Sequence, residues 1–379
     1  MRVLIDYRAA LRERTGVGEY THELVRALAA AGRMGSSIPP VDVTIFSSSS
    51  KDRLNDSGDL GGVHRVDRRI PVRLLNLAWH RLQWPPAETL AGGGFDVVHS
   101  LHPLLMPSRR AAQVVTIHDL NFLLHPERTR AEIRRDYPGL ARAHALRADR
   151  VIVVSRFTAS EVERLLQIPS DRISICSPGR PAWKPRPAQP ADGYVLFFGT
   201  LEPRKNVGTL LDAYERLVSR RTDVPELRLA GKATEQSAEW LARIARPPLS
   251  RVVRHVGYVA PEQRHALYAG ARMLVQPSYE EGFGLPVLEA MTAGVPVIGA
   301  NAGAIPEVGG DALQLVSPTD ADAMAHAIER FLDDTALVEA CVARGVTRSE
   351  DYTWDRTAAA TVAAYTRAIE HRANAKSVA

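Results

Sequence analysis

The chain has 379 residues, enough for two or three domains of ordinary size. Its 45% hydrophobic and 24% charged residues are typical of a globular protein, and no apolar run reaches the roughly 18 residues expected of a membrane-spanning helix. The net charge of +5 comes from scattered arginines without interleaved aromatics, so no nucleic-acid partner is expected. Only Cys176 and Cys341 are present, which excludes a disulfide framework and a cysteine metal cluster and favours a cytoplasmic location.

Short apolar segments alternate with helical segments along the first half, a pattern typical of βαβ units around a parallel sheet. The N-terminal run that ends at Asp6 lacks the long apolar core of a signal peptide and predicts a first strand. Strands are expected at Val3–Ile5, Val41–Phe46, Phe95–His99, Val114–Ile117, Val151–Val154 and Ile173–Cys176, and helices at Gly18–Ala31, Thr129–Leu146 and Thr158–Leu166. The polar stretch 47–62 is predicted to be a loop.

The segment Arg73–Pro86 interrupts this alternation and carries two tryptophans, Trp79 and Trp84, among leucines and arginines. Its pattern is that of an amphipathic helix. Such a helix can lie on a lipid interface or contact a lipid-linked acceptor, and it can equally be an ordinary helix that packs on the core. Both interpretations remain open, and core packing is the more common arrangement.

The stretch Ser177–Asp192 contains five prolines and is predicted to link two domains. A second α/β pattern follows it. Strands are expected at Tyr194–Phe198, Leu227–Leu229, Val252–His255, Met273–Gln276, Pro296–Ile298 and Leu313–Val316, and the last helices near Asp320–Leu332, Thr335–Arg344 and Thr353–His371. We therefore expect two doubly wound α/β halves with a cleft between them, where ligands bind beyond the carboxyl ends of the strands.

Two glutamates, Glu281 and Glu289, bracket a short segment with the sequence Gly-Phe-Gly-Leu-Pro-Val-Leu. The glycines allow a close approach of the backbone, and Pro286 suits the first position of a helix, so Glu289 is expected in its first turn. A helix N-terminus favours a phosphate, and carboxylates accept hydrogen bonds from sugar hydroxyls. The segment therefore predicts a site for a sugar joined to a diphosphate.

A second anion-binding segment, Gly199–Asn206, follows the expected strand Tyr194–Phe198 directly. Gly199 frees the turn, and Arg204 and Lys205 then stand at the carboxyl end of the strand. Two adjacent cations can neutralise a pyrophosphate and stabilise it as a leaving group. A solvated basic loop is the alternative, and the matching segment some 80 residues later favours the functional interpretation.

Together these motifs resemble the family-four retaining glycosyltransferases of the GT-B fold. The resemblance extends across nearly the whole C-terminal half, where it includes Gly257–Val259, Gln276–Ser278, Ala293–Val297 and Pro306–Val308. It implies an α/β protein with two facing Rossmann-like domains and an interdomain cleft. The acceptor-side domain is expected over residues 1–180 and the nucleotide-sugar donor domain over 181–353, with a C-terminal helix, 354–379, that crosses back to the first domain.

The resemblance also implies roles for individual residues. Arg204 and Lys205 would hold the donor diphosphate, Glu281 would meet the donor sugar and Glu289 the nucleotide ribose. The remaining donor-binding positions that it implies are Gly199 in the turn after the strand, Tyr258 and Val259 near the base, and Gly282, Phe283, Gly284 and Leu285 near the sugar or phosphate. No metal is needed in the family, and the sequence has no Asp-x-Asp pair.

In the N-terminal half the resemblance is looser. Gly16 and Gly18 correspond to the family's glycine loop, which approaches phosphate and acceptor. A dinucleotide fingerprint would need a third glycine where Thr21 stands, so a nicotinamide-dependent oxidoreductase is disfavoured. His118 follows the strand Val114–Ile117, and the resemblance implies that it contacts the donor sugar and supports charge at the anomeric centre. A histidine bound to structure at a strand end is the alternative.

The expected reaction is retaining transfer of a hexose from a nucleotide diphosphate sugar, with His118, Arg204, Lys205 and Glu281 as the catalytic set and no cofactor. The motifs look most like bacterial mannosyltransferases that use GDP-mannose. The expected acceptor is a cell-envelope glycan or a lipid-linked acceptor, and contact with the inner membrane surface is compatible with the basic charge.

Other functions stay open from the sequence. A UDP-glucose or other UDP-sugar donor, an epimerase or phosphorylase on the same fold, and a noncatalytic nucleotide-sugar-binding protein are each compatible with the motifs. A pyridoxal phosphorylase would need a dedicated lysine, which none of the five lysines suggests. A serine hydrolase would need a Gly-x-Ser-x-Gly elbow, which the sequence lacks.

Overall fold

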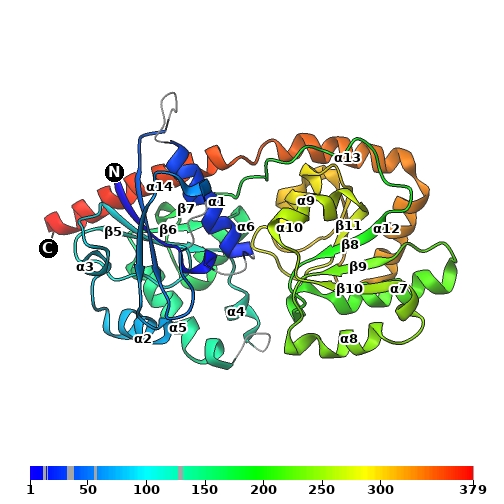
Figure 1. Cartoon of the computed structure of the whole chain (residues 1–379), viewed down its shortest axis with the longest axis horizontal. Helices are drawn as coiled ribbons and strands as arrows, with labels where there is room; N and C mark the ends of the chain where they lie inside the picture. Colours follow the sequence, from blue (N-terminus) through cyan, green and yellow to red (C-terminus); the bar gives the residue numbers. More distant parts are fainter. Residues whose placement is uncertain (12–13, 15, 32–37, 55–57, 127–130, 379) are drawn as a thin grey trace. The chain divides into compact units, whose positions relative to one another are not determined.

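The computed structural model describes residues 1–11, 14, 16–31, 38–54, 58–126 and 131–378. The chain divides into two compact units, of which the first comprises Met1–Gly179 with Thr353–Ala379 and the second Arg180–Tyr352. The proline-rich stretch Ser177–Asp192 contains the boundary between them. Figure 1 shows a parallel sheet with helices around it in each unit.

The first unit is built on a parallel sheet in the order β3-β2-β1-β4-β5-β6-β7. Its strands are β1 (Arg2–Asp6), β2 (Asp42–Ser48), β3 (His64–Arg68), β4 (Val97–Ser100), β5 (Ala112–Ile117), β6 (Arg150–Val153) and β7 (Ile173–Ile175). The central strands are buried on both faces, which explains why they read as continuous apolar runs instead of alternating ones. The six strands expected from the sequence in this half are confirmed.

The helices of the first unit lie around this sheet (Figure 1). They are η1 (Arg8–Ala10), α1 (Gly16–Ala31), η2 (Gly58–Leu60), α2 (Val72–Leu77), η3 (Ala78–Leu82), α3 (Ala87–Ala91), α4 (Asn121–Leu124), α5 (Ala131–Arg147), α6 (Arg156–Glu161), η5 (Val162–Leu166), η6 (Ser170–Arg172) and α14 (Trp354–Val378). α14 belongs to this unit although it is last in sequence, and it packs on α1 and β5. Its Tyr365 hydroxyl lies 2.8 Å from His99 Nδ1 of β4.

One strand of the first sheet was not expected. β3 has the sequence His-Arg-Val-Asp-Arg and pairs in parallel with β2 at the edge of the sheet. Charged side chains are tolerated there because an edge strand exposes one side to water, and they protect the edge from pairing with another chain. The expected loop 47–62 is also shorter than the sequence indicated, since β2 runs to Ser48 and η2 covers Gly58–Leu60.

The second unit has a parallel sheet in the order β10-β9-β8-β11-β12-β13. Its strands are β8 (Tyr194–Phe198), β9 (Leu227–Ala230), β10 (Val253–Gly257), β11 (Ala271–Gln276), β12 (Val297–Ala300) and β13 (Leu313–Val316). Its helices are η7 (Pro203–Lys205), α7 (Val207–Arg220), η8 (Glu235–Ser237), α8 (Ala238–Ile244), η9 (Leu249–Arg251), α9 (Pro261–Ala269), α10 (Leu285–Thr292), α11 (Ile305–Gly309), η10 (Gly310–Ala312), α12 (Ala321–Asp333) and α13 (Thr335–Ser349). All six strands expected in this half are confirmed.

A core of buried aliphatic and aromatic side chains holds the second sheet against its helices. Tyr214 and Leu217 of α7, Leu229 of β9 and Phe331 of α12 are members of one buried cluster. Each large aliphatic or aromatic side chain in such a core contributes about 1.5–3 kcal/mol by its burial. The second unit is therefore a rigid support for the loops at the carboxyl ends of its strands.

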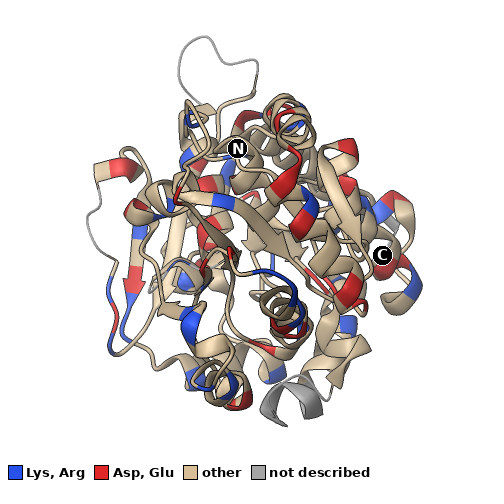
Figure 2. Cartoon of the chain, turned by 90° about the vertical axis from the view of Figure 1, so that its right-hand side faces the viewer, with Lys and Arg blue, Asp and Glu red and all other residues tan. Residues whose placement is uncertain are grey.

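Charged residues are interspersed along the ribbon, with Lys and Arg close to Asp and Glu in the view of Figure 2. Within the described part of the chain, no helix combines the length and the hydropathy that crossing a bilayer requires.

Candidate functional site

The candidate site of the second unit lies where the strand order reverses, at the adjacent strands β8 and β11. In open parallel sheets such a switch point is where ligands bind, beyond the carboxyl ends of the strands. Residues 199–206 follow β8, and residues 277–284 follow β11. A hydrogen bond from the Tyr279 amide to the Arg204 carbonyl, 2.9 Å long, joins the two loops.

The loop after β8 is folded by two residues with positive φ. Gly199 has φ +154°, and a β-carbon there would lie 3.5 Å from Lys205 Cε, so the Lys205 stem passes close over it. Asn206 has φ +56° and is the residue directly before α7. Its side-chain amide donates to the carbonyls of Pro277 and Pro318 at 2.9 and 2.6 Å. These bonds fix the short η7 turn that carries Arg204 and Lys205.

Arg204, Lys205 and Glu281 come together at this switch point. Lys205 Nζ lies 2.5 Å from Glu281 Oε1, and Arg204 Nη1 lies 3.3 Å from Glu281 Oε2. Arg204 Nε also pairs with the more exposed Glu202 at 2.6 Å. The Lys205 and Glu281 side chains are only 9% and 7% exposed, whereas that of Arg204 is 23% exposed. Two cations thus stand side by side on one buried carboxylate.

Two further side chains hold Glu281 in place. Ser278 Oγ and Gln276 Nε2 donate to Oε1 at 2.7 and 3.0 Å. Gly303 packs against its backbone, because a β-carbon at this glycine would lie 2.7 Å from both the amide nitrogen and the carbonyl oxygen of Glu281. The carboxylate is therefore fixed by neighbours in the sequence as well as by the two cations.

The electrostatics of the group follow from burial and from the opposite charges. Burial by itself raises the pKa of the Glu281 carboxyl, but Lys205, Arg204 and the hydrogen bonds from Lys205 and Ser278 outweigh it and lower the pKa to about 2. Burial and the neighbouring Arg204 lower the pKa of Lys205, and Glu281 opposes that shift. The carboxylate is thus ionised at every physiological pH.

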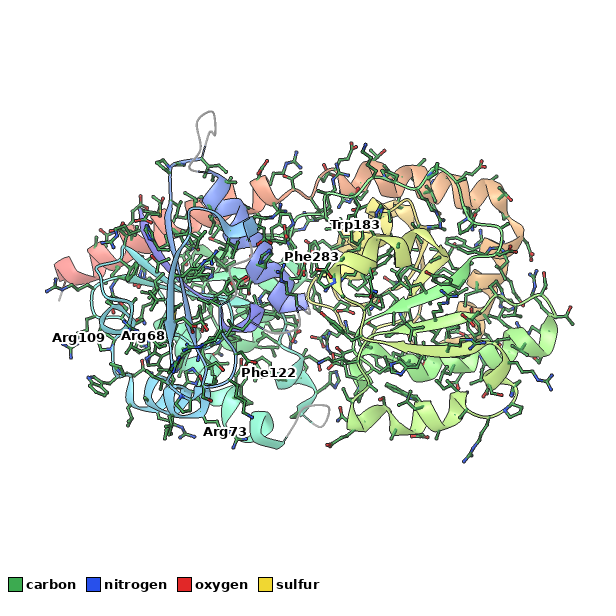
Figure 3. All side chains as sticks on the ribbon, in the orientation of Figure 1. Arg68, Arg73, Arg109, Phe122, Trp183 and Phe283 are labelled. Carbon is green, nitrogen blue, oxygen red and sulfur yellow. The ribbon has the colours of Figure 1, made fainter. Side chains whose placement is uncertain are left out.

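The glycine segment after Glu281 leads into α10, as the sequence predicted, but with two differences. Gly284 has φ +100° and precedes the helix, whose first residue is Leu285, so Pro286 is the second residue and not the first. Glu289 is the fifth residue and lies beyond the first turn. The helix begins one residue earlier than expected because Gly284 can adopt the left-handed conformation that ends the loop. Phe283, labelled in Figure 3, is buried and packs edge-on against Tyr352 at 5.5 Å between ring centres.

The second glutamate of the segment, Glu289, pairs with an arginine of α9. Its Oε1 lies 3.7 Å from Arg264 Nη1 of α9. The Arg264 guanidinium lies 5.8 Å from the ring centre of Phe198, the last residue of β8. Both Glu289 and Arg264 are buried, at 7% and 6% exposure. Glu289 is thus held close to the end of β8.

Gly257 ends β10, and Tyr258 and Val259 follow it, next to the glycine turn after β9. The Gly231 amide donates to the Gly257 carbonyl at 2.8 Å. Lys232 Nζ lies 5.8 Å from the centre of the Tyr258 ring, and Tyr258 and Val259 are half-buried. Both turns lie at the same carboxyl edge as the cations, because β8, β9 and β10 are parallel neighbours.

In the first unit, His118 follows β5 at the carboxyl edge of the sheet. Its Nε2 lies 3.2 Å from the Leu101 carbonyl, and its ring meets Tyr20 of α1 edge-on at 5.0 Å between centres. Burial lowers its pKa to about 4, partly opposed by Asp119 and by the bond to Leu101. Because a carbonyl can only accept, Nε2 carries the proton, and the neutral ring presents Nδ1 as an acceptor.

The two glycines near the start of α1 differ in their surroundings. Gly16 is the first residue of the helix and a β-carbon there would meet nothing within 4 Å. A β-carbon at Gly18 would lie 2.6 Å from the Ala9 carbonyl oxygen, so this glycine lets α1 pack closely on η1. Both glycines lie in the helix itself, which begins at Gly16, two residues before the expected start at Gly18.

Several residues of these sites were not predicted from the sequence. Ser278, Gln276 and Gly303 support Glu281, and Arg264 supports Glu289. Ser278 and Gln276 lie in a segment that resembles the family, but nothing in their spacing indicated that both would donate hydrogen bonds to the Glu281 carboxylate. Among the described residues, no cluster of three or more His, Cys, Asp or Glu side chains is arranged to hold a metal ion.

Comparison with known proteins agrees with this geometry. Residues 180–348 match the family model of glycosyl transferases group 1, and residues 14–181 match that of glycosyltransferase family 4. The chain is 32% identical over 373 residues to O-antigen chain mannosyltransferase B of Escherichia coli, covering 93% of this chain and 96% of that protein. It is 28% identical over 362 residues to phosphatidyl-myo-inositol mannosyltransferase of Mycolicibacterium smegmatis, covering 89% and 86%.

The likeness extends to solved structures. Sucrose-phosphate synthase from Thermosynechococcus elongatus matches with a TM-score of 0.73 and 23% identity, over 94% of this chain and 96% of that one. The two parallel-sheet units therefore have the GT-B fold. The chain belongs to the family-4 glycosyltransferases, and it is a glycosyltransferase of glycan biosynthesis.

Proposed function

We propose that the protein transfers mannose from GDP-mannose to a hydroxyl of a cell-envelope glycan, with retention of configuration at the anomeric carbon and without a metal ion. The observation that carries the proposal is the pair of cations, Arg204 and Lys205, held by Glu281 at the switch point of the second sheet. A diphosphate is the ligand that two adjacent fixed cations favour, and mannosyl transfer is what the relatives are named for.

In this proposal the chemical step is the departure of the nucleoside diphosphate. The bond between the anomeric carbon and the diphosphate oxygen breaks, the acceptor oxygen bonds to that carbon on the same face, and the acceptor proton passes to the departing phosphate. Arg204, Lys205 and the N–H groups at the start of α10 stabilise the negative charge that develops. Because Oε1 of Glu281 already accepts three hydrogen bonds, Oε2 is the oxygen that can receive a hydroxyl of the sugar.

The remaining donor contacts follow the same edge. Glu289 would receive the ribose hydroxyls, Tyr258 and Val259 would border the base, and the backbone at Gly199 and from Gly282 to Leu285 would approach the phosphate and sugar. In the first unit, Nδ1 of His118 would accept a hydrogen bond from the sugar, and Gly16 and Gly18 would leave room for the phosphate and acceptor.

We further propose that the protein works in the cytoplasm, at the inner face of the membrane, where a glycan acceptor can be linked to lipid.

The test is a panel of nucleotide sugars, scored for release of free nucleotide with and without an envelope-glycan acceptor. GDP-mannose should release GDP only when acceptor is present, an excess of EDTA should leave the rate unchanged, and the product should carry an α-linked mannose. Release of UDP from UDP-glucose in place of GDP would transfer the proposal to the runner-up donor. Binding without release under all conditions would indicate a noncatalytic nucleotide-sugar-binding protein.

A further inference from the structure

The helix α9 presents two polar side chains to Glu289 from positions one turn apart. Arg264 and Tyr268 are separated by four residues, so they lie on the same face of the helix. Both are buried, at 6% and 0% exposure. Arg264 Nη1 lies 3.7 Å from Glu289 Oε1, and the Glu289 carboxylate acts on the Tyr268 hydroxyl. One face of α9 therefore supplies a positive charge and a hydroxyl to a single buried carboxylate.

The proton of the Tyr268 hydroxyl is held firmly. Burial raises the pKa of this hydroxyl most, the Glu289 carboxylate raises it further, and the positive charge of Arg264 opposes the shift. Tyr268 therefore stays protonated and can donate a hydrogen bond to the carboxylate, which can only accept. Within the described part of the chain, the Tyr268 hydroxyl has no other hydrogen-bond partner. Because a buried hydroxyl needs a partner, Glu289 is the group that Tyr268 serves.

Aromatic side chains from β8 and from the proline-rich stretch hold this face of α9 in place. Phe198, the last residue of β8, lies 5.5 Å from Tyr268 between ring centres, and its ring centre is 5.8 Å from the Arg264 guanidinium. Trp183 of the proline-rich stretch, labelled in Figure 3, packs on Tyr268 at 5.7 Å and stacks on His265 at 5.2 Å. Packing on two sides restricts the rotamers of Arg264 and Tyr268 before any ligand binds.

We propose that Arg264 and Tyr268 are positioning residues that aim the Glu289 carboxylate at the ribose of the nucleotide, and that they thereby set how much the ribose hydroxyls add to its affinity. The inference rests on the ribose contact of Glu289 in the proposed function. A carboxylate that is already fixed by an arginine and a hydroxyl loses little rotamer freedom when a ribose binds, and its charge strengthens each hydrogen bond that it accepts. Loss of either support leaves Glu289 free to turn away, while contacts to the diphosphate stay in place.

The experiment is calorimetric titration of the full chain with GDP and with 2′,3′-dideoxy-GDP, which lacks both ribose hydroxyls. The wild type should bind GDP at least about tenfold more tightly, because a hydroxyl that donates to a charged group strengthens binding by roughly that factor. Glu289→Gln should abolish most of this ratio. Tyr268→Phe and Arg264→Gln should each lower the ratio by about threefold or more and leave the affinity for the dideoxy nucleotide within about twofold of the wild type. Arg264→Lys, which keeps the charge, should retain more of the ratio than Arg264→Gln.

Two control variants are matched in chemistry and lie on other helices of the same unit. Tyr214 of α7 is buried in the core, where its hydroxyl donates to the Pro225 carbonyl at 3.4 Å, and Arg243 of α8 pairs with a carboxylate at 2.6 Å. Tyr214→Phe and Arg243→Gln should therefore leave the ratio of affinities at the wild-type value. A double-mutant cycle adds a further check, since Tyr268→Phe should not change the ratio once Glu289→Gln is present. A general loss of stability would not produce that result.

The outcomes separate the positioning role from the proposed function. Unchanged ratios in Tyr268→Phe and Arg264→Gln, beside a lost ratio in Glu289→Gln, would overturn the positioning role and leave the ribose contact standing. An equal fall in the affinities for both nucleotides would also overturn it, because it would show damage to the whole site. Equal wild-type affinities for the two nucleotides would overturn the ribose contact itself, whereas release of GDP from GDP-mannose would still support the transferase. If the donor panel returns UDP, then UDP and 2′,3′-dideoxy-UDP are the probes, since the ribose is common to both.

Discussion

Replacing Lys205 by methionine is expected to separate the two roles of this lysine, in stability and in turnover. At 2.5 Å from Glu281 Oε1, the ammonium contributes a Coulomb attraction of roughly 7 kcal/mol at an effective dielectric constant of 20, before desolvation is subtracted. Without Lys205 the buried Glu281 keeps only Arg204 as an opposite charge, and loss of one partner of a buried pair costs about 3–5 kcal/mol. For a domain of this size, such a loss lowers Tm by roughly 10 °C.

The same substitution removes a charge that the proposal assigns to the departing diphosphate. Loss of one group that stabilises the developing charge lowers kcat by about 10²–10³-fold. The matched control is Lys205→Met/Glu281→Gln, in which no buried charge is left without its partner. This double variant should recover most of the lost Tm, because both members of the pair are gone, but it should recover none of the lost kcat.

Thermal unfolding and the initial rate of GDP release measure the two effects independently. A stable and active Lys205→Met enzyme would refute both the buried pair and the leaving-group role. Recovery of kcat in the double variant would show that Lys205 acts only by neutralising Glu281.

Three further predictions follow from the geometry. Because the pKa of Glu281 is lowered in the folded state, its carboxylate contributes stability above the ordinary carboxyl pKa of about 4.5, and this stability is lost as pH falls toward 2. Over that pH window the free energy of unfolding, measured with urea, should fall by about 3 kcal/mol more for the wild type than for Glu281→Gln. Because the pKa of His118 is lowered to about 4, its ring is neutral above pH 5.5, and kcat/KM should show no inflection from His118 between pH 5.5 and 8. His118→Ala should nevertheless lower kcat about 10²-fold. An inflection near pH 6.5 that is absent from His118→Ala would contradict the assignment. Gly18→Ala should lower the free energy of unfolding by about 1–3 kcal/mol, because its β-carbon would lie 2.6 Å from the Ala9 carbonyl oxygen. Gly16→Ala, which has open space around its β-carbon, should melt like the wild type. Equal Tm values for the two variants would contradict the close packing of α1 on η1.

Most of the sheet framework could be predicted from the sequence, because strands buried on both faces read as short apolar runs. β8 shows this, since Tyr-Val-Leu-Phe-Phe is apolar at every position and Gly199 follows it at once. β3 could not be predicted in this way, because an edge strand is free to carry charges and His64–Arg68 has them at four of its five positions if the histidine is counted. Local pattern indicates burial, and it becomes uninformative where a strand is only half-buried.

The site was predictable as a set of residue types but not as a set of contacts. Gly199, Arg204 and Lys205 follow one strand and Glu281 follows another, and two strand ends that are far apart in sequence meet only because the sheet order places β8 beside β11. The sequence therefore could not show that Glu281 binds both cations. The contact of Glu289 with Arg264 was hidden for the same reason, since α9 and α10 are separated by β11.

The central claim is that Arg204 and Lys205 hold a diphosphate, and calorimetric titration with GDP and GMP tests it most directly. Each fixed cation on the β-phosphate should make GDP bind at least tenfold more tightly than GMP to the wild type, and this preference should largely disappear in Arg204→Gln. Equal affinities of the wild type for GDP and GMP would contradict the account.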